Sequence, residues 1–266
     1  MSCCISGSVT SATPTGSEIS LGGAPCYLST PPGSNPPPSS SILLLPDVFG
    51  FASPNARVIA DTLAARCGVC VYIPELMAGD SLPHTLEPAL IGPGAGAGVL
   101  ARLSSGLSFV SSLPTFISWM ARHGDSVTLP RMSSFLAALR AERGVTRLCV
   151  TGYCWGGRHA ILLGAAAMPA GLKVCGLVPV HPSSVSATEM AAAQGVPARY
   201  ILAGKDAIAP SAAVVAAAAP SATARTWAGM AHGFAIRGNE GDAAVSAARA
   251  EAIQDAAEFI VKVLSE

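Results

Sequence analysis

The sequence predicts an α/β fold in which a mostly parallel central sheet is covered by helices on both faces. Short apolar runs, such as 42–45, 69–73 and 174–180, are typical of strands that are buried on both faces. Segments with helical spacing lie between most of these runs, which is the pattern of strand–helix–strand units. Because no internal repeat and no break in composition divides the chain, residues 1–266 are expected to form a single domain.

The composition favours a protein that acts on a small molecule. Hydrophobic residues make up 50% of the 266 residues and charged residues only 12%, so a substantial core is available. Basic and acidic residues balance at 16 each, which gives no electrostatic reason to expect a nucleic-acid or membrane partner. The N-terminal sequence has no signal-peptide pattern, and no apolar run approaches ~18 residues. We expect a cytoplasmic monomer, with a dimer as the alternative.

The cysteines are expected to be reduced. Of the eight, Cys70, Cys149 and Cys175 fall in predicted buried strands, which does not fit a disulfide framework. Cys67 and Cys70 form a C-x-x-C pair, but no second pair or histidines complete a zinc site. We therefore expect no metal and no cofactor.

The first part of the chain is expected to contribute strands and one helix. Residues 1–23 are rich in Ser, Gly and Thr and are expected to form a loose entry. Ile42–Leu45 predicts a buried strand. Ser53 followed by Pro54 is typical of a helix start, and Gly68 of its end. Other predicted segments are an edge strand at 25–29, a Pro/Ser loop at 31–41 and a strand at 69–73.

Residues 74–110 show no continuous periodicity, because Pro, Gly and Ser interrupt every candidate helix or strand. Residues 92–98 are low in complexity. We expect this region to form a lid or loop over the site.

The second part of the chain alternates helices and strands more clearly. Helices are predicted at 113–122, 130–143, 158–168, 210–219 and 243–264, and strands at 148–150, 174–180, 200–203 and 224–227. Gly144 ends the second of these helices.

The stretch Val150–Gly157 has the spacing of a nucleophile elbow. Gly152 and Gly156 flank Cys154 at two residues on each side, as in G-x-S-x-G but with a thiol in place of the hydroxyl. Small residues are needed there because the nucleophile's backbone is strained. The helix that follows favours a thiolate at its N-terminus and offers N–H groups to an oxyanion. Cys154 is therefore the candidate nucleophile.

An acid and a histidine follow this elbow at the ends of later predicted strands. Asp206 and His232 complete the order nucleophile, acid, histidine, which is that of the α/β-hydrolase triad. The imidazole would take the thiol proton, and the carboxylate would orient the imidazole. His181 also follows a strand and is the competing base, although its position breaks this order. The remaining histidines, His84, His123 and His159, are expected at loop or helix-surface positions.

These motifs together resemble the dienelactone hydrolase (carboxymethylenebutenolidase) family, which has the α/β-hydrolase fold. The resemblance covers about residues 40–264 and is carried by four segments, namely Pro46–Gly50, Gly152–Gly157, the Asp206 loop and His232–Phe234. It implies Cys154, Asp206 and His232 as the triad, with the backbone N–H groups of Val48 and Trp155 as the oxyanion hole. The activity that it implies is cleavage of a small lactone or carboxylic ester.

The resemblance also implies roles for residues around the triad. Asp47 stands where the family has a glutamate that bonds the resting thiol and gates its ionisation, although Asp47 could simply bond the loop backbone. Arg237 comes one residue later than the family's arginine and is a candidate for binding a substrate carboxylate, or else faces solvent. Tyr153 and Phe234 are expected to contact the substrate.

Two functions of other classes remain open at this point. The chain could be a small-ligand-binding protein that kept the scaffold without turnover, because a fold does not fix a function. Alternatively, Cys154 could be a redox-sensing thiol, which would be oxidised by peroxide without esterase activity.

Overall fold

The central sheet contains eight strands among the residues that the structure, a computed structural model, describes, namely 9–33, 39–83, 86 and 99–266. The strand order is β1-β2-β4-β3-β5-β6-β7-β8. The pairs β1·β2 and β2·β4 are antiparallel, and every other pair is parallel. The predicted α/β-hydrolase fold, with its mostly parallel sheet, is therefore confirmed.

The sequence bounds of the elements follow the predicted alternation of strands and helices. The strands are β1 (Ser17–Leu21), β2 (Ala24–Ser29), β3 (Ser40–Leu45), β4 (Cys70–Pro74), β5 (Arg147–Tyr153), β6 (Lys173–Val180), β7 (Arg199–Lys205) and β8 (Thr223–Ala231). The helices are α1 (Pro54–Cys67), α3 (Val99–Arg122), α4 (Asp125–Arg143), α5 (Trp155–Ala165), α6 (Ala187–Ala192), α7 (Ala212–Ala218), α8 (Phe234–Arg237) and α9 (Ala243–Ser265).

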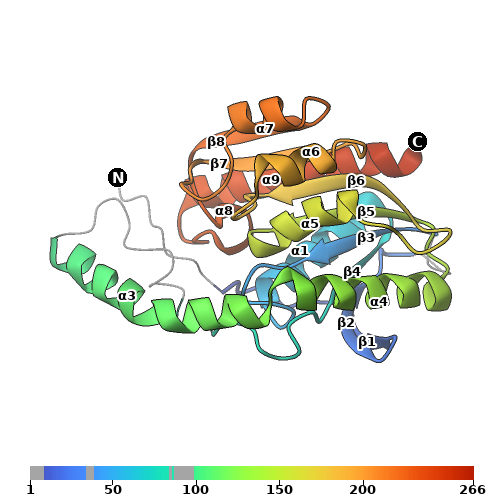
Figure 1. Ribbon diagram of the computed structural model, residues 1–266, viewed down its shortest axis with the longest axis horizontal. Helices are drawn as coiled ribbons and strands as arrows, with labels where there is room; N and C mark the ends of the chain where they lie inside the picture. The colour runs from blue at the N-terminus through green and yellow to red at the C-terminus, as the bar shows by residue number, and fades with distance from the viewer. Residues whose placement is uncertain (1–8, 34–38, 84–85, 87–98) are drawn as a thin grey trace.

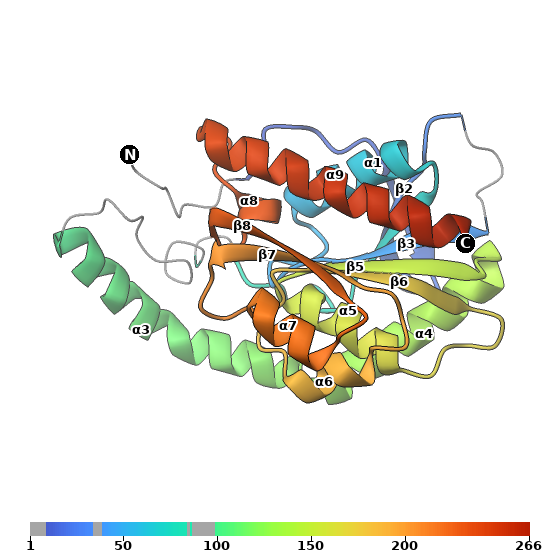
Figure 2. The ribbon, with the colours of Figure 1, turned by 90° about the horizontal axis from the view of Figure 1, so that it is seen from above.

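Helices cover both faces of the sheet, and each face has its own hydrophobic core (Figures 1 and 2). Helices α1, α8 and α9 pack on one face, while α3 to α7 lie on the other. In β3, Leu43 and Leu45 enter one core and Ile42 and Leu44 enter the other, since successive side chains of a strand point to opposite faces. Burial on both sides explains why this strand is a continuous apolar run.

Three expectations about the N-terminal half are wrong. Residues 17–21 are not part of a loose entry but form β1, and β2 lies between β1 and β4 rather than at the edge. In the region expected to form a lid or loop, residues 99–110 are helical. The low-complexity segment 92–98 lies outside the described residues.

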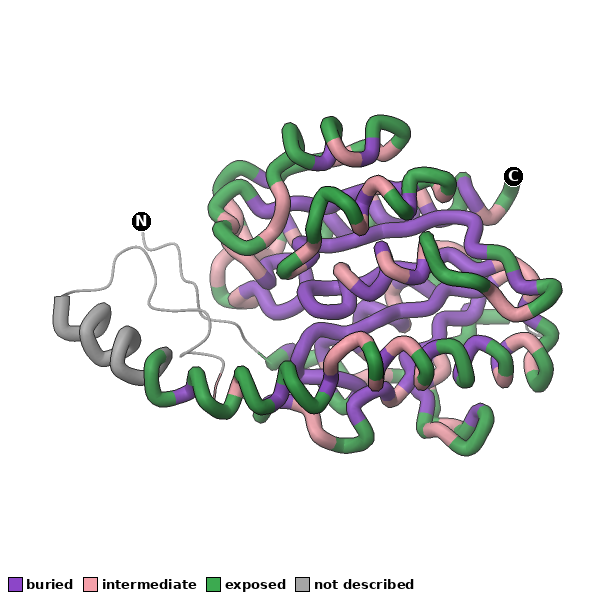
Figure 3. The backbone as a smooth tube through the Cα atoms, in the orientation of Figure 1, coloured by how far each residue is buried: buried purple, intermediate pink, exposed green. Residues whose placement is uncertain are grey.

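The described C-terminal part of helix α3, from residue 110 onwards, is mostly exposed, in contrast to the buried strands of the sheet (Figure 3). This part carries exposed apolar side chains at Val110, Ile117 and Met120, while Trp119 is fully buried. Within the described part of the chain, no helix combines the length and apolar character needed to cross a bilayer.

Candidate active site

The candidate site lies at the edge of the sheet where the parallel strands end. Asp47 follows β3, Cys154 follows β5, Asp206 follows β7 and His232 follows β8. Because the carboxyl ends of parallel strands share one edge, residues far apart in sequence converge there.

Cys154 occupies a strained turn between β5 and α5. Its φ of 55° and ψ of −113° lie outside the regions that most residues adopt. The flanking glycines leave no room for a side chain. A Cβ on Gly152 would lie 2.1 Å from the carbonyl oxygen of Gly156, and one on Gly156 would lie 2.2 Å from that of Leu45. The glycine spacing read from the sequence is therefore required by close backbone packing.

The backbone of Cys154 is also tied to the loop that follows β6. Cys154 N–H donates to the carbonyl of Val180 at 3.0 Å, and Ser183 N–H donates to the carbonyl of Cys154 at 3.1 Å. A Cβ on Gly157 would lie 2.9 Å from Cα of Pro182, so this glycine allows the loop to approach the elbow.

A line of polar contacts runs from the thiol to a buried carboxylate. Cys154 Sγ lies 3.2 Å from Ser183 Oγ, which lies 3.3 Å from His232 Nε2. His232 Nδ1 donates to Asp206 Oδ2 at 2.7 Å. Asp206 Oδ1 accepts from the N–H groups of Ile208 and Ala209 at 3.0 and 3.1 Å. The three triad candidates are thus brought together, and a serine hydroxyl contacts both Cys154 and His232, which are themselves hydrogen-bonded to each other.

The electrostatics of this line favour a thiolate and an imidazolium. Burial raises the pKa of the Cys154 thiol, but the charge and hydrogen bond of His232 outweigh burial and lower that pKa overall. Burial lowers the pKa of His232, yet Cys154 and the bond to Asp206 raise it to about 10. Asp206 is buried, but its bond to His232 holds the pKa of its carboxyl below the usual value. These shifts favour the charged form of the pair over the neutral one.

His181, the competing base, lies against His232 without a carboxylate partner. The two rings are 4.8 Å apart, and His181 is fully buried. Both of its ring nitrogens lack a hydrogen-bond partner among the described residues. Burial, together with the positive charge of His232, holds the pKa of His181 well below its usual range, so its ring is neutral.

The backbone N–H groups predicted for an oxyanion hole lie at the start of α5 and in the turn after β3. Trp155 is the first residue of α5, and Val48 begins the turn after β3 that approaches Gly156. Among the described residues, no acceptor is recorded for either N–H group.

Asp47 and Arg237 form a buried ion pair. Arg237 Nε donates to Asp47 Oδ2 at 2.6 Å, and the exposed fractions of the two residues are 4% and 0%. The alternative that Arg237 faces solvent is therefore wrong. Asp47 Oδ1 accepts from the N–H of Phe49 at 3.1 Å, and the hydrogen-bond partners of the thiol are His232 and Ser183 rather than Asp47. Asp47 still acts on the thiol through its charge, which opposes ionisation of Cys154.

Several other expectations about side chains need correction. Tyr153 and Phe234 are 1% and 3% exposed and lie in the core, so they support the site from within rather than line it. His123 and His159 are buried, not at the surface, at 4% and 1% exposure. His84 lies outside the described residues.

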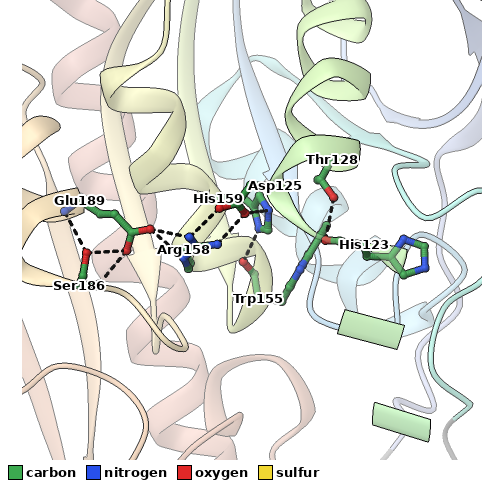
Figure 4. Close-up of polar contacts among 8 residues, drawn as sticks. All are labelled: His123, Asp125, Thr128, Trp155, Arg158, His159, Ser186 and Glu189. Atoms are coloured by element: carbon green, nitrogen blue, oxygen red, sulfur yellow. Dashed lines mark hydrogen bonds and ion pairs between the residues drawn. The ribbon is translucent and has the colours of Figure 1, made fainter. Parts of the chain in front are cut away.

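A polar network holds the elbow helix α5 between two neighbouring helices. Arg158 donates to both carboxylate oxygens of Asp125, at the first turn of α4, and to Glu189 of α6 (Figure 4). His159 Nδ1 donates to the carbonyl of Trp155 at 2.9 Å. Bidentate arginine–carboxylate pairs fix orientation as well as distance. Helix α5, and with it the nucleophile, is held from both sides.

Ser183 is the member of the site that sequence reasoning missed. Its position in the segment His181–Ser184, which follows a strand that neighbours β5, could have indicated a place near the nucleophile. In the sequence analysis, only the histidine of that segment was considered as a site residue.

The sheet order and the strained residue at the turn between β5 and α5 define an α/β hydrolase. A solved structure of a Klebsiella pneumoniae protein assigned to the dienelactone hydrolases has the same fold, with a TM-score of 0.65 at 17% identity, covering 92% of this chain and 98% of that one. The model of the dienelactone hydrolase family matches residues 25–264, and the chain belongs to this family.

Two fungal relatives are also named as hydrolases. Hydrolase pyvD of Aspergillus violaceofuscus is 29% identical over 193 residues, which are 73% of this chain and 66% of the relative. Hydrolase tropI of Talaromyces stipitatus is 25% identical over 272 residues, covering 100% of this chain and 97% of the relative. The chain is accordingly a dienelactone-hydrolase-like hydrolase.

Proposed function

We propose that this protein cleaves a small carboxylic ester or lactone through a thioester formed at Cys154, without a cofactor. The observation that carries the proposal is the line of contacts from Asp206 through His232 and Ser183 to the thiol, at one edge of the sheet. Membership of the dienelactone hydrolase family supports hydrolysis of ester bonds. The nucleophile and the substrate class are inferred from the site.

In the first half-reaction, the Cys154 thiolate attacks the carbonyl carbon and forms a carbon–sulfur bond. The carbonyl oxygen becomes an oxyanion, which the N–H groups of Val48 and Trp155 would bind. The ester carbon–oxygen bond then breaks, and His232 gives its proton to the leaving oxygen. In a lactone this oxygen stays attached to the acyl chain.

In the second half-reaction, water attacks the thioester carbon while the now neutral His232 takes the water proton. Collapse of this intermediate expels the Cys154 thiolate and releases the carboxylic acid, which restores the starting ion pair. Asp206 keeps the proton on Nδ1 throughout, so Nε2 exchanges protons with the reacting groups.

The ion pair with Asp47 bears on the role proposed for Arg237. A substrate carboxylate would reach the guanidinium only by displacing Asp47, since Arg237 is buried. That exchange would also displace the Asp47 carboxylate, whose negative charge opposes ionisation of the Cys154 thiol. Paired esters with and without a free carboxylate test it, because a clamp at Arg237 predicts faster turnover of the anionic ester.

The nucleophile is tested with Cys154→Ala, assayed on an activated aryl ester. Turnover should fall to the uncatalysed rate, and brief acid quenching of the unmodified protein should trap an acyl group on the peptide containing Cys154. Cys175→Ala is the matched control, because Cys175 is a buried thiol that lies near the start of β6, away from the strand ends.

Retained turnover in Cys154→Ala would remove the mechanism. A protein that shows rapid oxidation of Cys154 by peroxide and no esterase activity would instead be a thiol sensor, a role that the lowered pKa of this thiol also allows.

A further inference from the structure

Ser183 places a hydroxyl group between the candidate nucleophile and its base. Its Oγ lies 3.2 Å from Cys154 Sγ and 3.3 Å from His232 Nε2, within hydrogen-bonding distance of both. A hydroxyl has one proton to donate and lone pairs to accept, so it serves both partners at once. The side chain is partly buried, which limits competition from water.

The loop that carries Ser183 is fixed against the elbow at considerable conformational cost. His181 and Ser184, on either side, have positive φ values of 35° and 55°. Non-glycine residues in this region are strained and persist only where the surroundings impose them. Here the backbone bonds of Cys154 to Val180 and Ser183 impose the register, as does the close approach of Pro182 to Gly157. The hydroxyl is therefore held in place before a substrate arrives.

The geometry points to Ser183 as a further catalytic residue, whose hydroxyl bridges the Cys154–His232 pair and stabilises it as a thiolate and an imidazolium. In the uncharged state the thiol donates directly to His232, and Ser183 Oγ contacts both side chains. The sulfur–hydrogen bond breaks as its proton passes to Nε2, and a thiolate and an imidazolium form with no change in oxidation state.

In the charged state the same hydroxyl stabilises both ions. It donates to the thiolate and accepts from the protonated Nε2, and hydrogen bonds to charged groups are the stronger ones. The other titratable groups that face the thiol are His232 and Asp47, and those that face His232 are Asp206 and His181. None of these groups supplies a neutral hydroxyl between the two ions.

This inference rests on the proposed function, because it assigns a role within the same site. It is tested on the full-length protein by alkylation of Cys154 with iodoacetamide across a pH series, with the modified peptide quantified by mass spectrometry. Ser183→Ala should move the midpoint of alkylation to higher pH and slow the reaction at pH 6 about tenfold, since one hydrogen bond to the thiolate is lost. Ester turnover should fall with it.

Two variants separate this role from simple packing. Ser183→Thr keeps the hydroxyl and should retain the original midpoint, while Ser184→Ala removes an exposed neighbouring hydroxyl and should change nothing. In a double-mutant cycle, the effect of Ser183→Ala on alkylation should be smaller in a His232→Ala background, because the hydroxyl then bonds the thiolate without also accepting from an imidazolium.

An unchanged midpoint in Ser183→Ala, or an equal effect of that substitution with and without His232, would overturn the bridge. Either result leaves the proposed function intact provided that Cys154→Ala abolishes ester turnover. Turnover that survives Cys154→Ala removes both.

Discussion

The loops after β6 and β8 each carry a histidine to the same edge of the sheet, His181 fully buried and His232 partly buried, and the two rings lie 4.8 Å apart. Their charge states are nevertheless opposite. His232 contacts Asp206 and the Cys154 thiol, which raise its pKa to about 10 although burial acts in the other direction. His181 has no such partners, and burial holds its pKa well below the usual range. Burial alone therefore does not decide the charge of a histidine at this site, whereas its partners do.

The largest expected effect comes from removing the partner that distinguishes His232. In Asp206→Asn, the imidazole loses both its fixed tautomer and its counter-charge, and kcat/KM for an activated ester should fall roughly 10³- to 10⁴-fold, as in related triads. Steady-state kinetics measure this effect, and an unchanged melting temperature would separate it from unfolding. A loss of less than about tenfold would mean that the bond to Asp206 does not set the state of His232.

Arg237, which forms a buried ion pair with Asp47, differs from the two histidines because its side chain is always positively charged. Arg237→Met would leave the Asp47 carboxylate buried without its guanidinium, which costs about 3–5 kcal/mol in comparable cases. Urea denaturation measures this loss of unfolding free energy. In the double variant Asp47→Asn with Arg237→Met much of the stability should return, and a double variant as unstable as the single one would contradict the pairing.

The pH dependence of turnover tests the charged state of His232 directly. Because its pKa is raised to about 10, His232 is protonated at neutral pH and loses that proton as the pH rises through about 10. The value of kcat/KM should therefore stay level near neutrality and fall on the alkaline side. A profile that instead rises with a midpoint near 6.5 would indicate a neutral, unpaired imidazole.

The smallest expected effect belongs to His181. His181→Phe replaces two nitrogens that have no partner among the described residues by an apolar ring, and the unfolding free energy should change by no more than about 1 kcal/mol. Ester turnover should stay within about threefold. Loss of turnover with retained folding would show that His181, and not His232, is the base.

The strands and the elbow were predictable because their signals are local. A run such as Ile42–Leu45 reports burial on both faces, and the spacing of Gly152 and Gly156 around Cys154 reports a turn that excludes side chains. Strand β1 was missed because polar residues alternate with apolar ones in Ser17–Leu21, as they do in an edge strand with one exposed face.

The parts of the site that could not be predicted depend on contacts between distant segments. Asp47 and Arg237 lie 190 residues apart, and neither sequence neighbourhood shows that the other will cover it. The place of Ser183 depends on two positive φ values in its loop, and the sequence gives no glycine or asparagine there to signal them. Their pairings become visible only in three dimensions.

The tight backbone contacts around the elbow limit how this protein can acquire new substrates. Any mutation at positions 152 or 156 would drive an added carbon into a carbonyl oxygen, and one at 157 would press on Cα of Pro182. Laboratory selection for altered specificity should therefore leave this triplet untouched. Adaptive changes would instead accumulate at residues around the site outside the elbow, where side chains can be exchanged without moving the sulfur of Cys154.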